Sequence, residues 1–271
     1  MRTLIKSYFE VMLLAVALML ITQPVSAKLP MLAHLADGRD LPKPYGINID
    51  VLSMEQDYEI DRFQLGLPNF AAIDTSLIHI ESETDYSALK LDAWIFPFLN
   101  AFVMFGKIDG STSVSLERVQ VPGLPVRFGN IDIDLDGDVL GGGLTAIVGD
   151  EKWFSSLTLS YSESDLDGDF SSNITTWSVM PRLGARFSKA QVWLTAMYLD
   201  IDENHSGRID LGVQTPAGPL APIPFDLSLQ PTQSVNYGVG TRFDVTDNLS
   251  TTLELTFGDR KHQFLNLNWR Y

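Results

Sequence analysis

The sequence predicts an all-β protein, a closed antiparallel transmembrane β-barrel of about 12 strands, with 10 to 14 possible. Three patterns predict this fold. Apolar and polar residues alternate along much of the chain, the alternating runs are longer than ordinary soluble strands, and the connections between them are alternately short and long. The clearest runs have 9 to 11 residues, the length at which a tilted strand crosses a bilayer.

Composition excludes several classes of function. The chain has 271 residues, a net charge of −15, no cysteine and an apolar fraction of 45%. So acidic a chain lacks the basic surface that a nucleic-acid partner requires. Without cysteine it can form no disulfide framework, thiolate nucleophile, cysteine-ligated zinc site or lipoprotein acyl anchor. The apolar fraction is too high for a disordered chain.

Residues 1–27 show the three parts of a secretory signal peptide. Arg2 and Lys6 supply the positive charge, an apolar stretch of 11 residues follows, and Val25 and Ala27 place small residues at the cleavage positions. At ~1.5 Å per residue this stretch spans only about half of a ~30 Å hydrocarbon core. We therefore expect cleavage rather than anchoring, and no later stretch is long enough for a transmembrane helix.

The remaining chain divides into two parts. Residues 28–44 contain three prolines and are expected to form a periplasmic leader or a small plug. Residues 45–271 are expected to form the barrel, although the run 75–82, which contains His79 and Glu81, could instead be loop. An even number of strands keeps both chain ends in the periplasm. The expected strands are 45–53, 58–66, 75–82, 86–95, 100–109, 139–148, 152–163, 173–184, 190–200, 234–244, 249–258 and 263–271.

The connections alternate in length. Four are short, at 97–100, 149–151, 187–189 and 246–248, and three are long and polar, at 109–138, 164–172 and 201–233. Short turns on one side and long loops on the other are typical of an outer-membrane barrel. Aromatic residues near the strand ends would supply an interfacial girdle: Trp94, Phe96, Phe98, Trp153, Phe154, Trp193, Tyr198 and Trp269.

The last residues carry a specific resemblance. Tyr271, Trp269 and Leu267 fall on one face of the terminal run, and Arg270 and Asn268 fall on the other. This resembles the C-terminal signal strand of Gram-negative outer-membrane β-barrel proteins. A secreted β-sandwich or a periplasmic lipocalin-like barrel would also alternate, but it need not end on an aromatic residue.

The resemblance implies a location and partners, without selecting a subfamily. It implies export through a cleaved signal peptide to the bacterial outer membrane, where lipid and lipopolysaccharide surround the barrel. It also implies that the barrel-assembly machinery recognises the terminal strand, with Trp269 and Tyr271 as the assembly signal. The oligomeric state stays open.

Polar faces of the predicted strands point into the lumen if the apolar faces meet lipid. These faces carry charges of both signs, which form either a hydrated path with a transverse field or a closed network that braces a narrow barrel. Side chains commonly fill small barrels, which favours the closed network. The expected lumen-facing charges are Lys90, Asp92, Arg182, Arg242, Asp244, Glu254 and Arg270.

One acidic pentapeptide, Asp-Leu-Asp-Gly-Asp, occurs twice and is expected at two extracellular loop tips. An EF-hand does not fit, because Gly143 occupies the twelfth position counted from Asp132. The alternatives are a looser Ca²⁺ or Mg²⁺ site and a solvated Asp-Gly hairpin turn, and no other cofactor or metal is expected. The carboxylates concerned are Asp134, Asp136, Asp138, Asp165, Asp167 and Asp169.

Three functions remain open. The first is porin-like passage or binding of small solutes, with cations or neutral solutes favoured over anions. The second is a lipid or lipopolysaccharide hydrolase or acyltransferase acting at the outer rim, where His205 and His262 are expected in or beside loops. The third is a structural or adhesion barrel with a sealed lumen. The chain carries no catalytic motif that favours an enzyme, and each histidine is expected to be a solvated loop residue.

Overall fold

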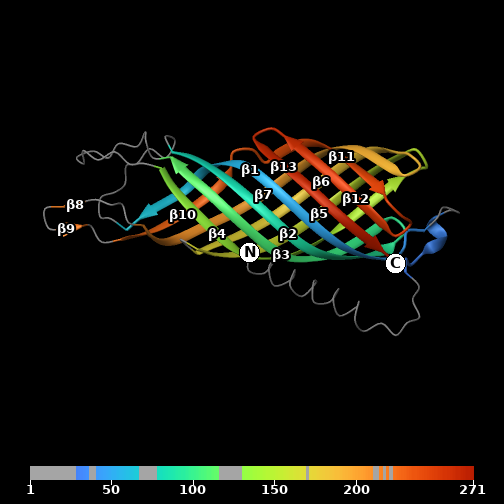
Figure 1. Ribbon diagram of the computed structural model, residues 1–271, viewed down its shortest axis with the longest axis horizontal. Coiled ribbons are helices and arrows are strands. Elements are labelled where there is room, and N and C mark those ends of the chain that lie inside the picture. The colour runs from blue at the N-terminus through green and yellow to red at the C-terminus, as the bar shows by residue number, and fades with distance from the viewer. Residues whose placement is uncertain are drawn as a thin grey trace, which may run out of the picture.

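A single antiparallel sheet of eleven strands dominates the structure. The computed structural model describes residues 29–36, 41–66, 78–115, 130–168, 171–209, 214–215, 218–219 and 222–271. The sheet closes on itself because β1 (Tyr45–Leu65) pairs with β2 on one side and with β13 on the other (Figure 1). No helix among the described residues is long and apolar enough to cross a membrane.

Consecutive strands pair in the order of the chain from β1 to β7. A separate ribbon of two short strands, β8 (Gln214–Thr215) and β9 (Gly218–Pro219), stands apart from the ring (Figure 1). The other strands are β2 His79–Phe96, β3 Leu99–Ser115, β4 Asn130–Gly149, β5 Trp153–Gly168, β6 Ser171–Arg186, β7 Ala190–Ile209, β10 Ile223–Pro231, β11 Val235–Asp244, β12 Leu249–Phe257 and β13 Arg260–Arg270.

The ring of described strands is wider in one half than in the other. In one half β11, β12 and β13 lie between β7 and β1, which makes ten strands, whereas in the other half β10 alone joins β7 to β1, which makes eight. The partner of β1 changes between Gln56, which faces Arg260, and Tyr58, which faces Pro231. The β12–β13 hairpin therefore ends part-way along β1. Its turn contains Gly258, whose φ of +125° favours glycine.

The two ends of the ring differ, although β5 and β6 occupy most of the predicted long loop 164–172. Four short connections lie at one end, which we call the turn end, and the opposite end is the loop end. The C terminus and the short helix η1 (Ala33–Ala36) also lie at the turn end (Figure 1). In the β4–β5 turn the backbone N–H groups of Trp153 and Lys152 donate to the carboxylate of Asp150, at 2.8 and 2.7 Å, and these bonds lower the pKa of that carboxylate.

Several predicted boundaries are wrong because the strands extend further than expected. Residues 45–53 and 58–66 belong to one strand, β1, and the described part of 75–82 joins 86–95 in β2. The predicted 109–138 loop contains the end of β3 and the start of β4. Both acidic pentapeptides lie in β4 and β5 rather than at loop tips, except for Asp169, which lies outside the described residues. The signal peptide, 1–27, also lies outside them.

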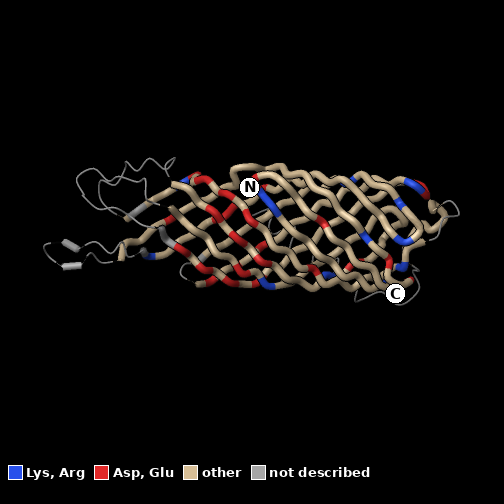
Figure 2. Tube along the Cα trace, turned by 45° about the horizontal axis from the view of Figure 1, so that its top comes forward, with Lys and Arg blue, Asp and Glu red and all other residues tan. Residues whose placement is uncertain are grey.

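A change in the exterior residues explains these errors. On β4 the even-numbered positions face outward, and from 132 to 138 they are all aspartates, whereas from 140 to 148 they are Leu, Gly, Leu, Ala and Val. The same change occurs between Phe105 and Asp109 on β3 and between Tyr198 and Asp200 on β7. Figure 2 shows that most of the Asp and Glu positions, in red, gather on the half nearest the loop end. Because the prediction relied on apolar exterior faces, it ended each of these strands at the point where the exterior residues become acidic.

The interior residues change in the opposite sense. On β4 the inward positions 133, 135 and 139 are Ile, Leu and Val and are buried, whereas 141, 143 and 145 are Gly, Gly and Thr. Apolar side chains thus occupy much of the interior of the loop-end half, together with buried polar residues such as Glu203 and His205, and side chains commonly fill small barrels. We call its buried members the apolar plug: Tyr58, Ile80, Ile133, Leu135, Leu166, Met197, Leu199, Ile201, Leu227 and Leu229.

Four aspartates stand side by side on the exterior of the loop-end half. Asp85 faces Asp109, Asp109 faces Asp136, and Asp136 faces Asp167 across neighbouring strands. Like charges directly opposite one another destabilise a sheet by about 0.2–1 kcal/mol per pair.

We therefore expect Asp136→Asn to raise the free energy of unfolding by about 0.4–2 kcal/mol at low salt, because it removes two such pairs. In about 1 M salt, where the Debye length is ~3 Å, most of this gain should vanish. Urea unfolding at both ionic strengths measures the change. Asp247→Asn, at an exposed turn position, is the control and should change little, and a salt-independent gain would contradict the explanation.

Candidate functional site

A cavity of about 1340 Å³ occupies the interior of the ten-stranded half. Its mouth is at the turn end, where Pro97, Gly149 and Phe187 of the turns and Leu35 and Leu41 of the leader line it. Residues 28–44 were expected to form a periplasmic leader or plug, and of their described part Leu35, Ala36, Leu41 and Pro42 line this mouth.

The cavity ends beneath the apolar plug. Tyr58, Met197 and Ile201 form part of its inner wall, while the plug residues Ile80 and Leu229 do not line it. The described interior is therefore open toward the turn end and filled toward the loop end.

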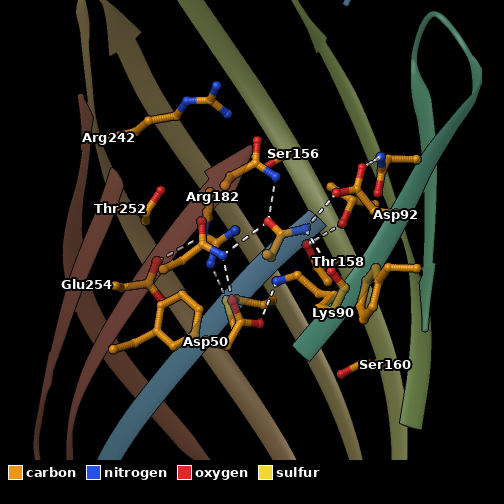
Figure 3. A pocket seen from close by; sticks show the side chains of 18 of the residues that line it. Asp50, Lys90, Asp92, Ser156, Thr158, Ser160, Arg182, Arg242, Thr252 and Glu254 are labelled. Atoms are coloured by element: carbon orange, nitrogen blue, oxygen red, sulfur yellow. Dashed lines mark hydrogen bonds and ion pairs between the residues drawn. The ribbon is translucent and has the colours of Figure 1, made fainter. Parts of the chain in front are cut away.

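All seven charged residues expected to face the lumen line this cavity. Lys90 Nζ lies 2.7 Å from Asp50 Oδ2, and Arg242 Nε lies 3.0 Å from Asp244 Oδ1. Arg270 donates to Asp92, which also accepts hydrogen bonds from the amides of Asn48 (2.8 Å) and Asn100 (2.6 Å). Figure 3 shows this network around Asp50, Lys90 and Asp92.

A second cluster is built around Glu254, which is only 1% exposed. Its Oε2 accepts hydrogen bonds from Arg182 Nε at 2.9 Å and from the indole Nε1 of Trp193 at 2.7 Å. The guanidinium of Arg182 also lies 5.4 Å from the Trp193 ring centroid, within range of a cation–π interaction. Strands β6, β7 and β12 together position the three side chains.

A glycine makes room for this cluster. A Cβ added at Gly240 would lie 2.3–2.5 Å from three atoms of the Trp193 ring. The indole of Trp193 therefore lies directly over the backbone of β11, and its Nε1 reaches Glu254 from there.

We expect Gly240→Ala to displace Trp193, to break its hydrogen bond to Glu254, and to cost about 1–3 kcal/mol as overpacking does. The shift of tryptophan fluorescence and the urea midpoint measure the effect. Gly110→Ala on β3 is the matched control, since its nearest non-neighbouring atoms would be 3.9 Å away. Equal stability of the two variants would show that Trp193 is not held as described.

Hydroxyl groups line another part of the wall. The inward positions of β5 from 156 to 164 are Ser, Thr, Ser, Ser and Ser, and all five line the cavity. Thr158 shares a hydrogen bond with Thr145 at 3.0 Å, and Ser160 shares one with Ser178 at 2.6 Å. Figure 3 shows Ser156, Thr158 and Ser160 along this strand.

Two histidines lie where the sequence did not place them. His205 and His262 were expected to be solvated loop residues, but they are 4% and 3% exposed and point into the ring from β7 and β13. His205 Nε2 lies 2.8 Å from Glu203 Oε1 at the level of the plug. His262 lines the cavity, with its Nε2 3.9 Å from Glu254 Oε1. Their neighbours in sequence are polar, so only the strand register reveals that they are buried.

The five described carboxylates among those considered for a cation site stand on the exterior of β4 and β5. Asp136 faces Asp167, and Asp138 faces Asp165 and lies 2.6 Å from Lys107 Nζ. Among the described residues there is no group of three or more His, Cys, Asp or Glu side chains that could hold a metal ion.

Comparisons with known proteins give weak structural similarities. No protein-family model and no curated protein sequence matches the chain. The chain is similar to the outer membrane protease OmpT from Escherichia coli, at 9% identity and a TM-score of 0.46, over 85% of this chain and 97% of that one. It is also similar to the outer membrane protein OprG from Pseudomonas aeruginosa, at 11% identity and a TM-score of 0.44, over 86% and 100%.

A further similarity is to the transport unit of the autotransporter AIDA-I from Escherichia coli. The identity is 11% and the TM-score 0.43, over 89% of this chain and 95% of that one. At these values the similarities do not extend to function, which has to be argued from the residues.

Proposed function

We propose that this chain is a Gram-negative outer-membrane β-barrel that takes up small solutes into a cavity open to the periplasm. The ten-stranded half spans the membrane, and the acidic eight-stranded half projects outside the cell. In this orientation the turn end faces the periplasm. Lipid and lipopolysaccharide then surround the barrel, and Trp269 and Tyr271 serve as the assembly signal.

The exterior of the ten-stranded half supports the membrane location. Apolar side chains face outward on every strand there, including Leu183, Leu194 and Tyr237, which are 60–68% exposed. So large an exposed apolar surface needs an apolar partner. The three strands confined to this half, β11, β12 and β13, have 10, 9 and 11 residues, the length that crosses a bilayer.

Aromatic residues mark both edges of the apolar belt, as interfacial girdles do. Those at the turn end are Tyr45, Trp153, Phe187, Phe243, Trp269 and Tyr271, and those at the boundary with the acidic half are Phe105, Trp177, Tyr198, Tyr237 and Phe257.

The cavity carries the proposal of solute uptake. Its walls offer ion pairs, amides and hydroxyls, and a space of about 1340 Å³ exceeds the usual range of small-molecule pockets, about 300–1,000 Å³. The apolar plug closes the way to the outside, so the described state holds a solute rather than conducting it, and passage requires the plug to move.

Two alternatives are less well supported. An enzyme acting on lipid at the outer rim would need accessible catalytic groups there, but His205 and His262 are both buried inside the ring. A purely structural barrel would need no polar space of this size.

The uptake proposal is tested by thiol reagents of different sizes, because the chain has no cysteine of its own. Purified Thr158→Cys, inside the cavity, should react with a small methanethiosulfonate but not with a polyethylene-glycol maleimide. Leu229→Cys, in the plug, should react with neither, and Lys152→Cys, in an exposed turn, with both. Failure of Thr158→Cys to react with the small reagent would contradict the proposal.

A further inference from the structure

The hydroxyl wall retains unused hydrogen-bonding capacity. Ser156 and Ser162 on β5 and Thr176 on β6 line the cavity, and their hydroxyls make no hydrogen bond within the described part of the chain. A hydroxyl can both donate and accept. This wall therefore suits a ligand whose own groups do the same.

Amides and a histidine face this wall from the other side of the ring. Strand β13 lies five strands from β5 in either direction around the ten, and its side chains Asn266, Asn268 and His262 line the cavity. Asn268 and His262 are 5% and 3% exposed, yet Asn268 Oδ1 and His262 Nδ1 have no hydrogen-bond partner among the described residues, while His262 Nε2 lies 3.9 Å from Glu254 Oε1. Unpartnered buried polar atoms are costly, so a ligand that bonds to them gains affinity.

The charges of the cavity cancel. Five basic and five acidic side chains line it, and four close ion pairs account for eight of them: Lys90–Asp50, Arg182–Glu254, Arg242–Asp244 and Arg270–Asp92. An ionic solute would have to leave water without an unpaired counter-charge, which is unfavourable. A neutral solute avoids that cost and leaves the ion pairs intact.

We propose that the cavity binds a neutral polyhydroxylated solute, of the class of free sugars, between the hydroxyls of β5 and β6 and the amides and histidine of β13. The inference rests on the proposed function, because the solute enters from the turn end. The hydroxyls of such a solute would pair with Ser156, Ser162, Asn268 and His262.

Calorimetry on the purified full chain tests the ligand class with four matched solutes. Glucose is neutral, glucuronate adds a negative charge, glucosamine adds a positive charge, and alanine is a zwitterion. Glucose should bind at least about tenfold more tightly than the other three. Equal or tighter binding of any of the other three would overturn the inference.

The same measurement on variants locates the site. Ser156→Ala combined with Ser162→Ala should weaken glucose binding about 3- to 10-fold for each hydroxyl removed. Ser155→Ala, on the same strand but exposed on the outside of the ring, is the control and should leave binding unchanged. Unchanged binding in the double variant would overturn the assignment. If glucose does not bind while Thr158→Cys still reacts with the small reagent, the ligand class is wrong and the proposed function stands.

Discussion

Replacing Glu254 by alanine is expected to lower the free energy of unfolding by about 3–5 kcal/mol. Glu254 is 1% exposed and accepts hydrogen bonds from Arg182 and Trp193. Removal of its carboxylate leaves the guanidinium of Arg182 without its counter-charge inside the barrel. Urea unfolding of the protein in lipid vesicles measures the loss.

Two further variants separate burial from charge. Asp244→Ala also removes one partner of an ion pair, but Asp244 and Arg242 have side chains 40% and 35% exposed, so the loss should stay below about 1 kcal/mol. Combining Glu254→Gln with Arg182→Met should recover much of the stability, because no unpaired charge is left. If Glu254→Ala were no more harmful than Asp244→Ala, the Glu254 cluster would not brace the barrel.

Thinning the apolar plug is expected to turn a closed barrel into a conducting one. Ile80 and Leu229 are 0% and 3% exposed and belong to one cluster in the eight-stranded half. Replacing both by alanine shortens two of the buried side chains that form the plug. Planar-bilayer recordings should show stepwise conductance for the double variant and none for the wild type.

Controls keep this result interpretable. Leu194→Ala removes an equally large side chain from the exposed exterior of the ten-stranded half, and this variant should stay closed. Each large-to-small change in the plug costs about 2–5 kcal/mol, so the double variant could be too unstable to insert into the bilayer. In that case Leu227→Asn, which makes the plug more polar, replaces it in the same recording and should also conduct. Stepwise conductance of the wild type itself would contradict a sealed outer half.

The strands that lie wholly in the apolar belt could be predicted closely from the sequence. Strand β11 was predicted at 234–244 and lies at 235–244, and β12 was predicted at 249–258 and lies at 249–257. Along them the exterior carries no charged residue and is apolar except for Thr241 and Thr251. The full length of the long strands could not be predicted, because acidic residues replace apolar ones on part of their exterior. On β1 these residues are Glu55 and Asp57.

The candidate site was predictable only in part, for a related reason. Alternation is enough to place Asp92 and Arg270 on inward faces, but they are 178 residues apart and meet only because the sheet closes. The plug could not be foreseen, since apolar residues such as Ile133 and Leu135 lie in the stretch 109–138, which was expected to be a loop. The phase of the pattern inverts on β4 where the ten-stranded half gives way to the eight-stranded half.

Labelling of single cysteines in intact Gram-negative cells tests the central claim most directly. Ser111→Cys lies on the exposed exterior of the loop-end half, and Thr158→Cys lies in the cavity. With a small membrane-impermeant thiol reagent outside the cell, only Ser111→Cys should react, and Thr158→Cys should react once the reagent is admitted to the periplasm. Reaction of Thr158→Cys from outside, or none at Ser111→Cys, would contradict a barrel that is closed outward and open to the periplasm.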